Sequence, residues 1–366
     1  MTHFLQILLL ICIVIFAAKM AGALSIKFGQ PSVFGEILIG LILGPTVLNM
    51  MHWPLFQNIE FTGTLMKHFG SMGVKPEELL ELVLKDMAEI GVILLMFVAG
   101  METDMKEMRR VGKVAFWAAC GGVVAPLLGA LGVGAAFGHS IPQSWFIGAI
   151  LTATSVSISA QTLMELRQLK SKEGSTILGA AVIDDVLGII VLALVVAFEL
   201  NTRSGIQATG SGQIIQVVQI VGRMVIFFAV AIWLGYKFLD KITEKVIKLP
   251  VSQPLMGFVL IVIFFYAWAA EHLGGVAAIT GSYIVGVLFA QTKFREKIDH
   301  GIHPITYSLF VPFFFISIGM EVNALQLGND LGFLIAIIIM AVITKVFGCW
   351  MGAKLTGFTG KIGRAS

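Results

Sequence analysis

Apolar residues in this chain come in blocks of about 20, long enough for an α-helix to cross the hydrocarbon core of a bilayer. Of the 366 residues, 57% are hydrophobic and only 13% are charged. This pattern predicts an all-α polytopic membrane protein rather than a soluble globule. Apolar windows predict about eleven transmembrane helices, over residues 4–24, 32–50, 87–103, 112–138, 142–165, 175–200, 213–239, 254–272, 274–291, 304–320 and 331–352.

Lysine and arginine are unevenly shared between the two sets of loops. If the N-terminus is outside, the inner loops hold 19 of these residues and the outer loops hold four. Basic loops stay on the cytoplasmic side, so we expect an N-out, C-in protein of the plasma membrane. Residues 51–86 then form an outer loop, with room for a short amphipathic helix at 77–86, and residues 353–366 form a cytoplasmic tail. We expect residues 1–366 to form a single transmembrane domain.

The composition argues against several classes of function. The net charge of +3 is small and dispersed, so nucleic acid is not an expected partner. The sequence has no phosphate-binding loop, dinucleotide fingerprint or metal-spaced cluster of histidines and cysteines. We therefore expect no cofactor and no enzymatic activity.

Two adjacent carboxylates, Asp184 and Asp185, lie within an apolar run of about 25 residues that is long enough to span a membrane. Ionisable groups at that depth are costly and mark ion or proton pathways. Lys345 is another charge far from any interface, and we expect it to have a carboxylate partner. Adjacent helical positions point roughly 100° apart, so one aspartate can pair with Lys345 while the other faces a water-filled cavity. A purely structural ion-pair cluster is the alternative.

A hydroxyl-rich run at 151–159 precedes the aspartates and includes Thr152, Thr154 and Ser155. These small residues could serve close helix packing. They could also mark a locally unwound helix whose carbonyl and hydroxyl oxygens help to coordinate a cation. Carboxylate and carbonyl oxygens suit Na⁺, Li⁺ or a proton. Competition between a proton and a metal cation for one carboxylate, at a site open alternately to each side, would give obligatory exchange.

Short glycine motifs suggest an internal repeat. The segment 35–40 is echoed at 281–286, and the segment 100–102 at 319–321. Both echoes are seven predicted helices apart, so the partners run in opposite directions, as in the inverted repeats of transporters. The same offset relates helix 112–138 to helix 331–352. It leaves helices 142–165 and 175–200 without partners before Ser366, so we expect the chain to lack the last two helices of the fold.

Several motifs, taken in order, resemble the cation:proton antiporter-2 family, and especially its NapA-type sodium/proton antiporters. They lie at residues 30–45, 97–104, 152–155, 182–185 and 313–320. The resemblance implies a homodimer in which one panel of helices forms the interface and a core bundle carries the ion across the membrane. It also implies that Asp185 is the main ion ligand and that Asp184 pairs with Lys345. The family continues beyond a stretch like 355–360 into a second broken helix and one further helix.

We therefore expect a transporter that exchanges Na⁺ or Li⁺ for H⁺ and contributes to pH homeostasis. Potassium/proton exchange and Kef-type potassium efflux are alternatives in the same class. An intramembrane aspartyl protease also needs two aspartates, but adjacent residues on one helix cannot easily flank a scissile bond. A sensor that does not transport, or an inactive fragment, is a further alternative.

Overall fold

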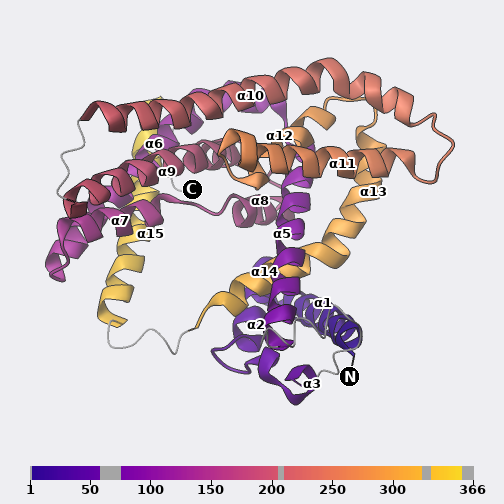
Figure 1. The fold of residues 1–366 in the computed structure, drawn as a ribbon, viewed down its shortest axis with the longest axis horizontal. Coiled ribbons are helices and arrows are strands. Elements are labelled where there is room, and N and C mark those ends of the chain that lie inside the picture. The colour runs from indigo at the N-terminus through magenta and orange to yellow at the C-terminus, as the bar shows by residue number, and fades with distance from the viewer. Residues whose placement is uncertain (1, 58–75, 205–209, 324–330, 357–366) are drawn as a thin grey trace. The chain divides into compact units, whose positions relative to one another are not determined.

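The computed structural model describes residues 2–57, 76–204, 210–323 and 331–356, and the regular elements in these ranges are all helices (Figure 1). A helix lies at each of the eleven predicted positions. In the described ranges, eight are long and apolar enough to cross a membrane. The shorter apolar helices α2 (Ser32–Leu43) and α12 (Ala278–Phe289) and the longer α5 (Pro76–Glu102) occupy the other three positions. The prediction of an all-α polytopic membrane fold is confirmed.

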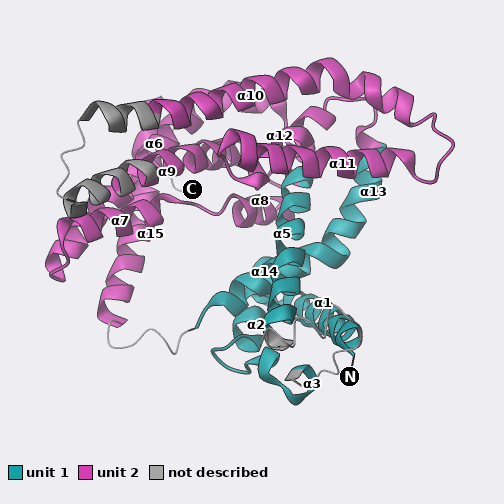
Figure 2. Ribbon diagram, viewed as in Figure 1, with its two compact units in different colours: residues 1–98, 297–328 teal, residues 99–296, 329–366 magenta. Residues whose placement is uncertain are grey.

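The chain divides into two compact units, each built from two stretches of sequence (Figure 2). Unit 1 comprises residues 1–98 and 297–328. Leu10 and Val14 of α1 (His3–Lys27) are completely buried there, in one apolar core with Phe313 and Ile316 of α14 (Val311–Glu321). The unit's short elements are η1 (Met50–His52), α3 (Pro54–Gln57) and the π-helical turn η3 (Thr306–Phe310).

Unit 2 comprises residues 99–296 and 329–366, and α6 (Met105–Ala136) is its central helix. This helix packs against α7 (Ile141–Thr152), α9 (Lys172–Ser204) and α15 (Leu331–Leu355). Val123 and Leu127 of α6 are buried with Ala149 of α7 in one apolar cluster, and Ala118 of α6 is buried with Ala353 of α15 in another. The remaining elements are α8 (Val156–Glu165), α10 (Gly210–Val246), α11 (Pro254–Ala269), η2 (Ala270–Gly274), α12 and the start of α13 (Arg295–Ile305). That residues 1–366 act as one domain stays a prediction.

The glycine echoes seen in the sequence make equivalent contacts in the two units. In unit 2, Gly100 of α5 lies against the backbone of Gly286 in α12. In unit 1, Gly319 of α14 lies against the backbone of Gly40 in α2. A side chain at Gly100 or Gly319 would enter the backbone of the neighbouring helix, so only glycine allows these crossings. The same pair of motifs thus builds the same helix crossing twice, as a repeat requires.

The helices that the repeat relates as a pair, α6 and α15, pack directly against each other. Gly121 of α6 and Gly348 of α15 face each other, and an added side chain at either one would meet the backbone at the other. This reciprocal contact brings α15 close along α6. It places Lys345, one turn before Gly348, beside α6 and near α9.

The hydroxyl-rich run interrupts a helix, as the second interpretation of the sequence predicted. Helix α7 ends at Thr152 and α8 begins at Val156, with extended backbone at Ala153 and Ser155. The Ser155 hydroxyl accepts a hydrogen bond from the Ile158 N–H at 3.3 Å and caps α8. A serine that caps a new helix stabilises the break, because it satisfies a backbone donor that would otherwise lack a partner.

The predicted loop 51–86 is shorter than expected, because residues 76–86 are the first turns of α5 rather than a separate short helix. The charged residues Glu81, Lys85 and Asp86 ended the apolar window, but charged side chains on one face do not stop helical hydrogen bonding. The predicted tail at 353–366 also begins later, because α15 continues to Leu355. Residues 58–75 of the loop and 357–366 of the tail lie outside the described residues.

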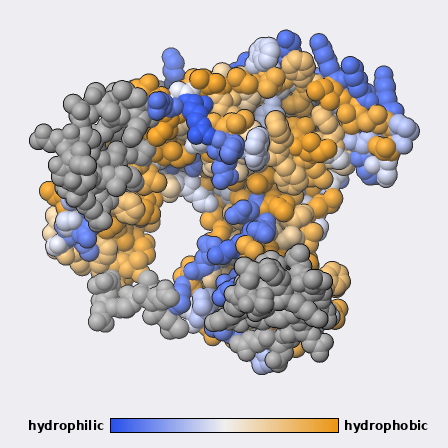
Figure 3. Space-filling view, in the orientation of Figure 1, coloured by the Kyte–Doolittle hydropathy of each residue, from blue (hydrophilic) through white to orange (hydrophobic). Residues whose placement is uncertain are grey.

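Large hydrophobic side chains are exposed on both units. Phe16 on α1 is 70% exposed, Phe28 directly after α1 is 75% exposed, and Ile226 on α10 is 65% exposed. In the space-filling view, hydrophobic residues cover much of the described surface (Figure 3). Exposed apolar surface on this scale is what a bilayer would cover.

Candidate ion-binding site

Asp184 and Lys345 lie in the middle of long apolar helices. Asp184 follows Lys172, the first residue of α9, by 12 residues, or roughly 18 Å of helix. Lys345 precedes Leu355, the last residue of α15, by 10 residues, or roughly 15 Å. Half the hydrocarbon core of a bilayer is about 15 Å, so both groups are placed at a depth where charge needs compensation.

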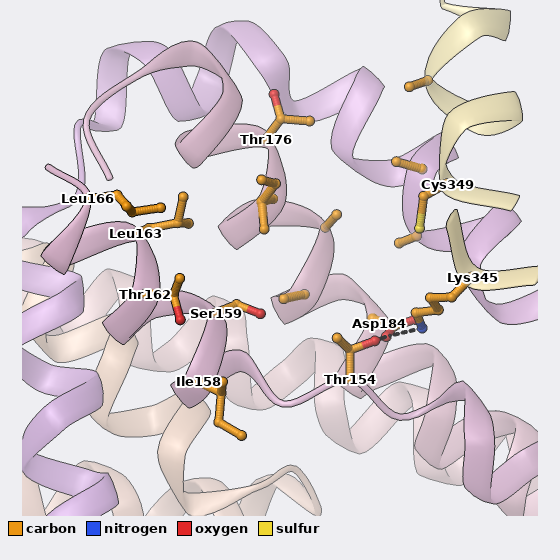
Figure 4. A pocket seen from close by; sticks show the side chains of 16 residues that line it. Thr154, Ile158, Ser159, Thr162, Leu163, Leu166, Thr176, Asp184, Lys345 and Cys349 are labelled. Carbon is orange, nitrogen blue, oxygen red and sulfur yellow. Dashed lines mark hydrogen bonds and ion pairs between the residues drawn. The ribbon is translucent and has the colours of Figure 1, made fainter. Parts of the chain in front are cut away.

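The two charges compensate each other. Lys345 Nζ lies 2.8 Å from Asp184 Oδ2, and the two side chains are 20% and 4% exposed (Figure 4). The Thr154 hydroxyl donates a hydrogen bond to the same carboxylate oxygen at 2.6 Å. A buried ion pair is tolerated when its geometry is good and further hydrogen bonds satisfy its atoms, and the hydroxyl supplies one of these bonds.

Lys345 also ties the pair to the broken helix. Its ammonium group donates a hydrogen bond to the carbonyl oxygen of Thr152 at 2.6 Å, where α7 ends. Carbonyls in the last turn of a helix lack intrahelical partners and carry partial negative charge, so a cation there is stabilised. One lysine of α15 therefore contacts both the end of α7 and a carboxylate of α9.

The three predicted hydroxyl residues have different roles in the structure. Only the Thr154 hydroxyl contacts an aspartate. The Thr152 hydroxyl donates back to the Ala149 carbonyl at 2.7 Å, and the Ser155 hydroxyl is used in the cap of α8. The structure therefore gathers Asp184, Lys345, the Thr154 hydroxyl and the Thr152 carbonyl in one place.

Asp185 is half-buried and does not line the cavity beside Asp184, but it lies within electrostatic range of Asp184 and Lys345. Two carboxylates thus lie near one ammonium group, which forms its ion pair with Asp184. In the described part of the chain, Asp184 Oδ1 is buried without a hydrogen-bond partner. With both aspartates ionised, the cluster carries an uncompensated negative charge, which a proton or a monovalent cation can neutralise.

A cavity of about 320 Å³ opens beside the ion pair, between α6, α8, α9 and α15. Apolar side chains form most of its wall. The hydroxyls of Ser159, Thr162 and Thr176 line it away from the ion pair (Figure 4). The sequence analysis missed these three residues, although the spacing held a signal. Thr176 precedes Asp184 by eight residues, which places both on one face of α9.

Comparison with known proteins identifies the family. Residues 11–363 match the family described as sodium/hydrogen exchanger, transmembrane. The chain belongs to this family. It is 35% identical to the probable Na(+)/H(+) antiporter GerT of Bacillus cereus over 346 residues, which cover 94% of this chain and 82% of the relative. It is also 35% identical to the Na(+)/H(+)-K(+) antiporter GerN of the same organism, over 96% of this chain and 81% of the relative.

The fold of this sodium/hydrogen exchanger family member is also similar to a solved one. The sodium proton antiporter MjNhaP1 from Methanocaldococcus jannaschii superposes with a TM-score of 0.60, over 99% of this chain and 81% of that chain, at 15% sequence identity. At that identity the likeness shows the fold alone. The family and fold expected from the sequence motifs are confirmed, and the roles of Asp184, Asp185 and Lys345 stay predictions.

Proposed function

We propose that the chain is a secondary active transporter that exchanges Na⁺ or Li⁺ for H⁺ across the plasma membrane. The observation that carries this proposal is the cluster at the end of α7, where Lys345 pairs with Asp184 and the adjacent Asp185 lies within electrostatic range of both. The relatives GerT and GerN are named as antiporters of Na⁺ and H⁺, which supports the same ions here.

In this mechanism the two aspartates have different tasks. Asp184 is held by Lys345 and Thr154 and keeps the cluster in place. Asp185 has no such partner among the described residues, and it binds the proton or the cation. Because both ligands need the same carboxylate, loading one releases the other. Alternating exposure of that carboxylate to the two sides then converts competition into exchange.

Potassium is the second candidate ion. GerN, which aligns over nearly the whole chain, is named a Na(+)/H(+)-K(+) antiporter. Carboxylate and carbonyl oxygens do not by themselves distinguish Na⁺ from K⁺, so the selectivity between these two ions depends on the size of the coordination shell. We further propose an N-out, C-in orientation, from the distribution of basic residues, and a homodimer in the membrane.

The experiment is uptake of radioactive sodium by proteoliposomes that contain the purified full chain. With an acidic lumen, the proposal predicts uptake that stops when an ionophore removes the pH gradient. Unlabelled LiCl should compete, and competition by KCl would show that potassium is also carried. Sodium uptake that is insensitive to the pH gradient would contradict exchange.

A further inference from the structure

A second cavity in unit 2, of about 510 Å³, is lined by four cationic side chains. Lys106 and Arg109 come from the first turns of α6, Lys170 from the segment between α8 and α9, and Arg295 from the start of α13. These three segments are far apart in sequence. All three belong to loops that the charge distribution assigns to the cytoplasmic side.

The carboxylates of the wall do not balance these cations. Among the described residues, the only carboxylates that line the cavity are those of Glu102 and Asp104. The Asp104 carboxylate is already used as the N-cap of α6, where it accepts a hydrogen bond from the Lys106 N–H at 2.8 Å. Four cations and two carboxylates leave the cavity with an excess of two positive charges.

The four cationic side chains also lack ion-pair partners among the described residues. In the part of the chain that the structure describes, no ion pair or side-chain hydrogen bond joins Lys106, Arg109, Lys170 or Arg295 to another residue. Like charges around one cavity repel one another, and an anion in the cavity would remove that cost. Lysine and arginine donors arranged in this way bind phosphate, with arginine able to donate two parallel hydrogen bonds.

Part of the wall is held in position before any ligand arrives. Gln291, which lines the cavity after α12, accepts a hydrogen bond from the Tyr236 hydroxyl of α10 at 2.7 Å. Its amide nitrogen donates to the Val287 carbonyl at 3.1 Å. Because these bonds fix the segment that leads to Arg295, less ordering is needed on binding.

We propose that this cavity binds a phosphate group, carried either by a lipid headgroup of the inner leaflet or by a soluble phosphate compound. The site is separate from the aspartate cluster, since none of its residues lines the cavity beside Asp184. The proposal therefore does not rest on ion exchange, and it is tested by binding.

The test uses the purified full chain and three variants. Arg109→Gln removes a cation from the wall, and Arg109→Lys keeps the charge. Lys113→Gln is the matched control, because Lys113 is an exposed residue one turn further along α6 that does not line the cavity. Thermal unfolding of every variant is measured first, so that loss of binding is not confused with loss of folding.

Two arms distinguish the sources of phosphate. In detergent, binding of inorganic phosphate and of adenosine monophosphate is measured by titration calorimetry. In the other arm the protein is placed in nanodiscs of phosphatidylcholine with phosphatidylglycerol, and the retained phosphatidylglycerol is counted by native mass spectrometry. A charge-assisted hydrogen bond contributes enough that Arg109→Gln should weaken binding about tenfold or more, with Arg109→Lys and Lys113→Gln close to the unmodified chain.

If binding in detergent is weakened in Arg109→Gln but not in Arg109→Lys or Lys113→Gln, the site binds a soluble phosphate compound. If the same difference between variants is seen only in the nanodiscs, the site binds a lipid headgroup. The absence of binding in both arms would overturn the proposal. An equal loss in Arg109→Gln and Lys113→Gln would also overturn it, because the positive surface as a whole would then be responsible.

Discussion

The charged side chains around the two cavities of unit 2 leave net charges of opposite sign. Beside the broken helix, Lys345 is paired with Asp184 at 2.8 Å, so a buried cation is neutralised within the protein and one further carboxylate remains. In the second cavity, the cations of Lys106, Arg109, Lys170 and Arg295 outnumber the carboxylates. The first site is left negative and the second positive.

This difference indicates which ligand each site suits. The aspartate cluster is enclosed by apolar helices, where an unpaired charge is costly. Each charge there therefore needs an ion-pair partner or a bound ion. In the second cavity Lys106, Arg109 and Lys170 are exposed and Arg295 is half-buried, so water can solvate these charges. Substitutions should therefore have large effects on stability at the first site, smaller effects at the second, and almost none outside both.

The largest effect on stability is expected from Lys345→Ala. This change leaves the Asp184 carboxylate buried without its cation, and breaking a buried pair in this way costs about 3–5 kcal/mol. Thermal unfolding of the detergent-purified protein measures the loss. The double variant Lys345→Ala with Asp184→Asn should recover much of it, because no buried charge is then left alone. Stability equal to the unmodified chain in Lys345→Ala would contradict the pairing.

A smaller loss is expected from Thr154→Val. The valine keeps the shape of the side chain but cannot donate to Asp184 Oδ2, while Lys345 still can. Loss of a hydrogen bond to a charged group costs about 1–3 kcal/mol. The Thr154→Ser variant is the control, because it keeps the hydroxyl. If Thr154→Val is as stable as the unmodified chain while Thr154→Ser is destabilised, the methyl group rather than the hydrogen bond is what matters.

The smallest effect is expected from Arg110→Gln, which lies outside both cavities. Arg110 makes an exposed ion pair with Glu107 at 3.5 Å, and its side chain is 73% exposed. Exposed pairs of this kind contribute at most about 1 kcal/mol. Its unfolding temperature and phosphate binding should match those of the unmodified chain. A loss as large as that of Lys345→Ala would mean that burial does not set the order of these effects.

Much of the site could be predicted from the sequence because charge inside an apolar helix is so constrained. Asp184, Asp185 and Lys345 stand out in runs that otherwise hold no charge, and few arrangements can satisfy them. The hydroxyl residues at 152–155 indicated a broken helix for a similar reason, because serine and threonine side chains compete for the hydrogen bonds of a helical backbone. The echoed glycine motifs indicated the internal repeat, because only glycine permits the close helix crossings that both copies make.

Other features could not be predicted because they depend on the meeting of distant segments. The Arg223 guanidinium of α10 donates to the backbone carbonyls of His272 and Leu273 at the π-helical turn η2, about 50 residues further along the chain. The second cavity likewise joins residues from three loops, and along the sequence their basic character predicts only an orientation in the membrane. Neither periodicity nor spacing along the chain carries that information.

The measurement that tests the central claim most directly is the collapse of a preformed pH gradient in everted membrane vesicles on addition of NaCl, LiCl or KCl. The chain is compared with Asp185→Asn, which removes the ionisable carboxylate and keeps the side-chain shape. We predict a cation-dependent collapse that is abolished in Asp185→Asn, with the most effective salt naming the ion. An equal collapse in Asp185→Asn, inserted in the membrane in equal amount, would contradict ion exchange at the aspartate cluster.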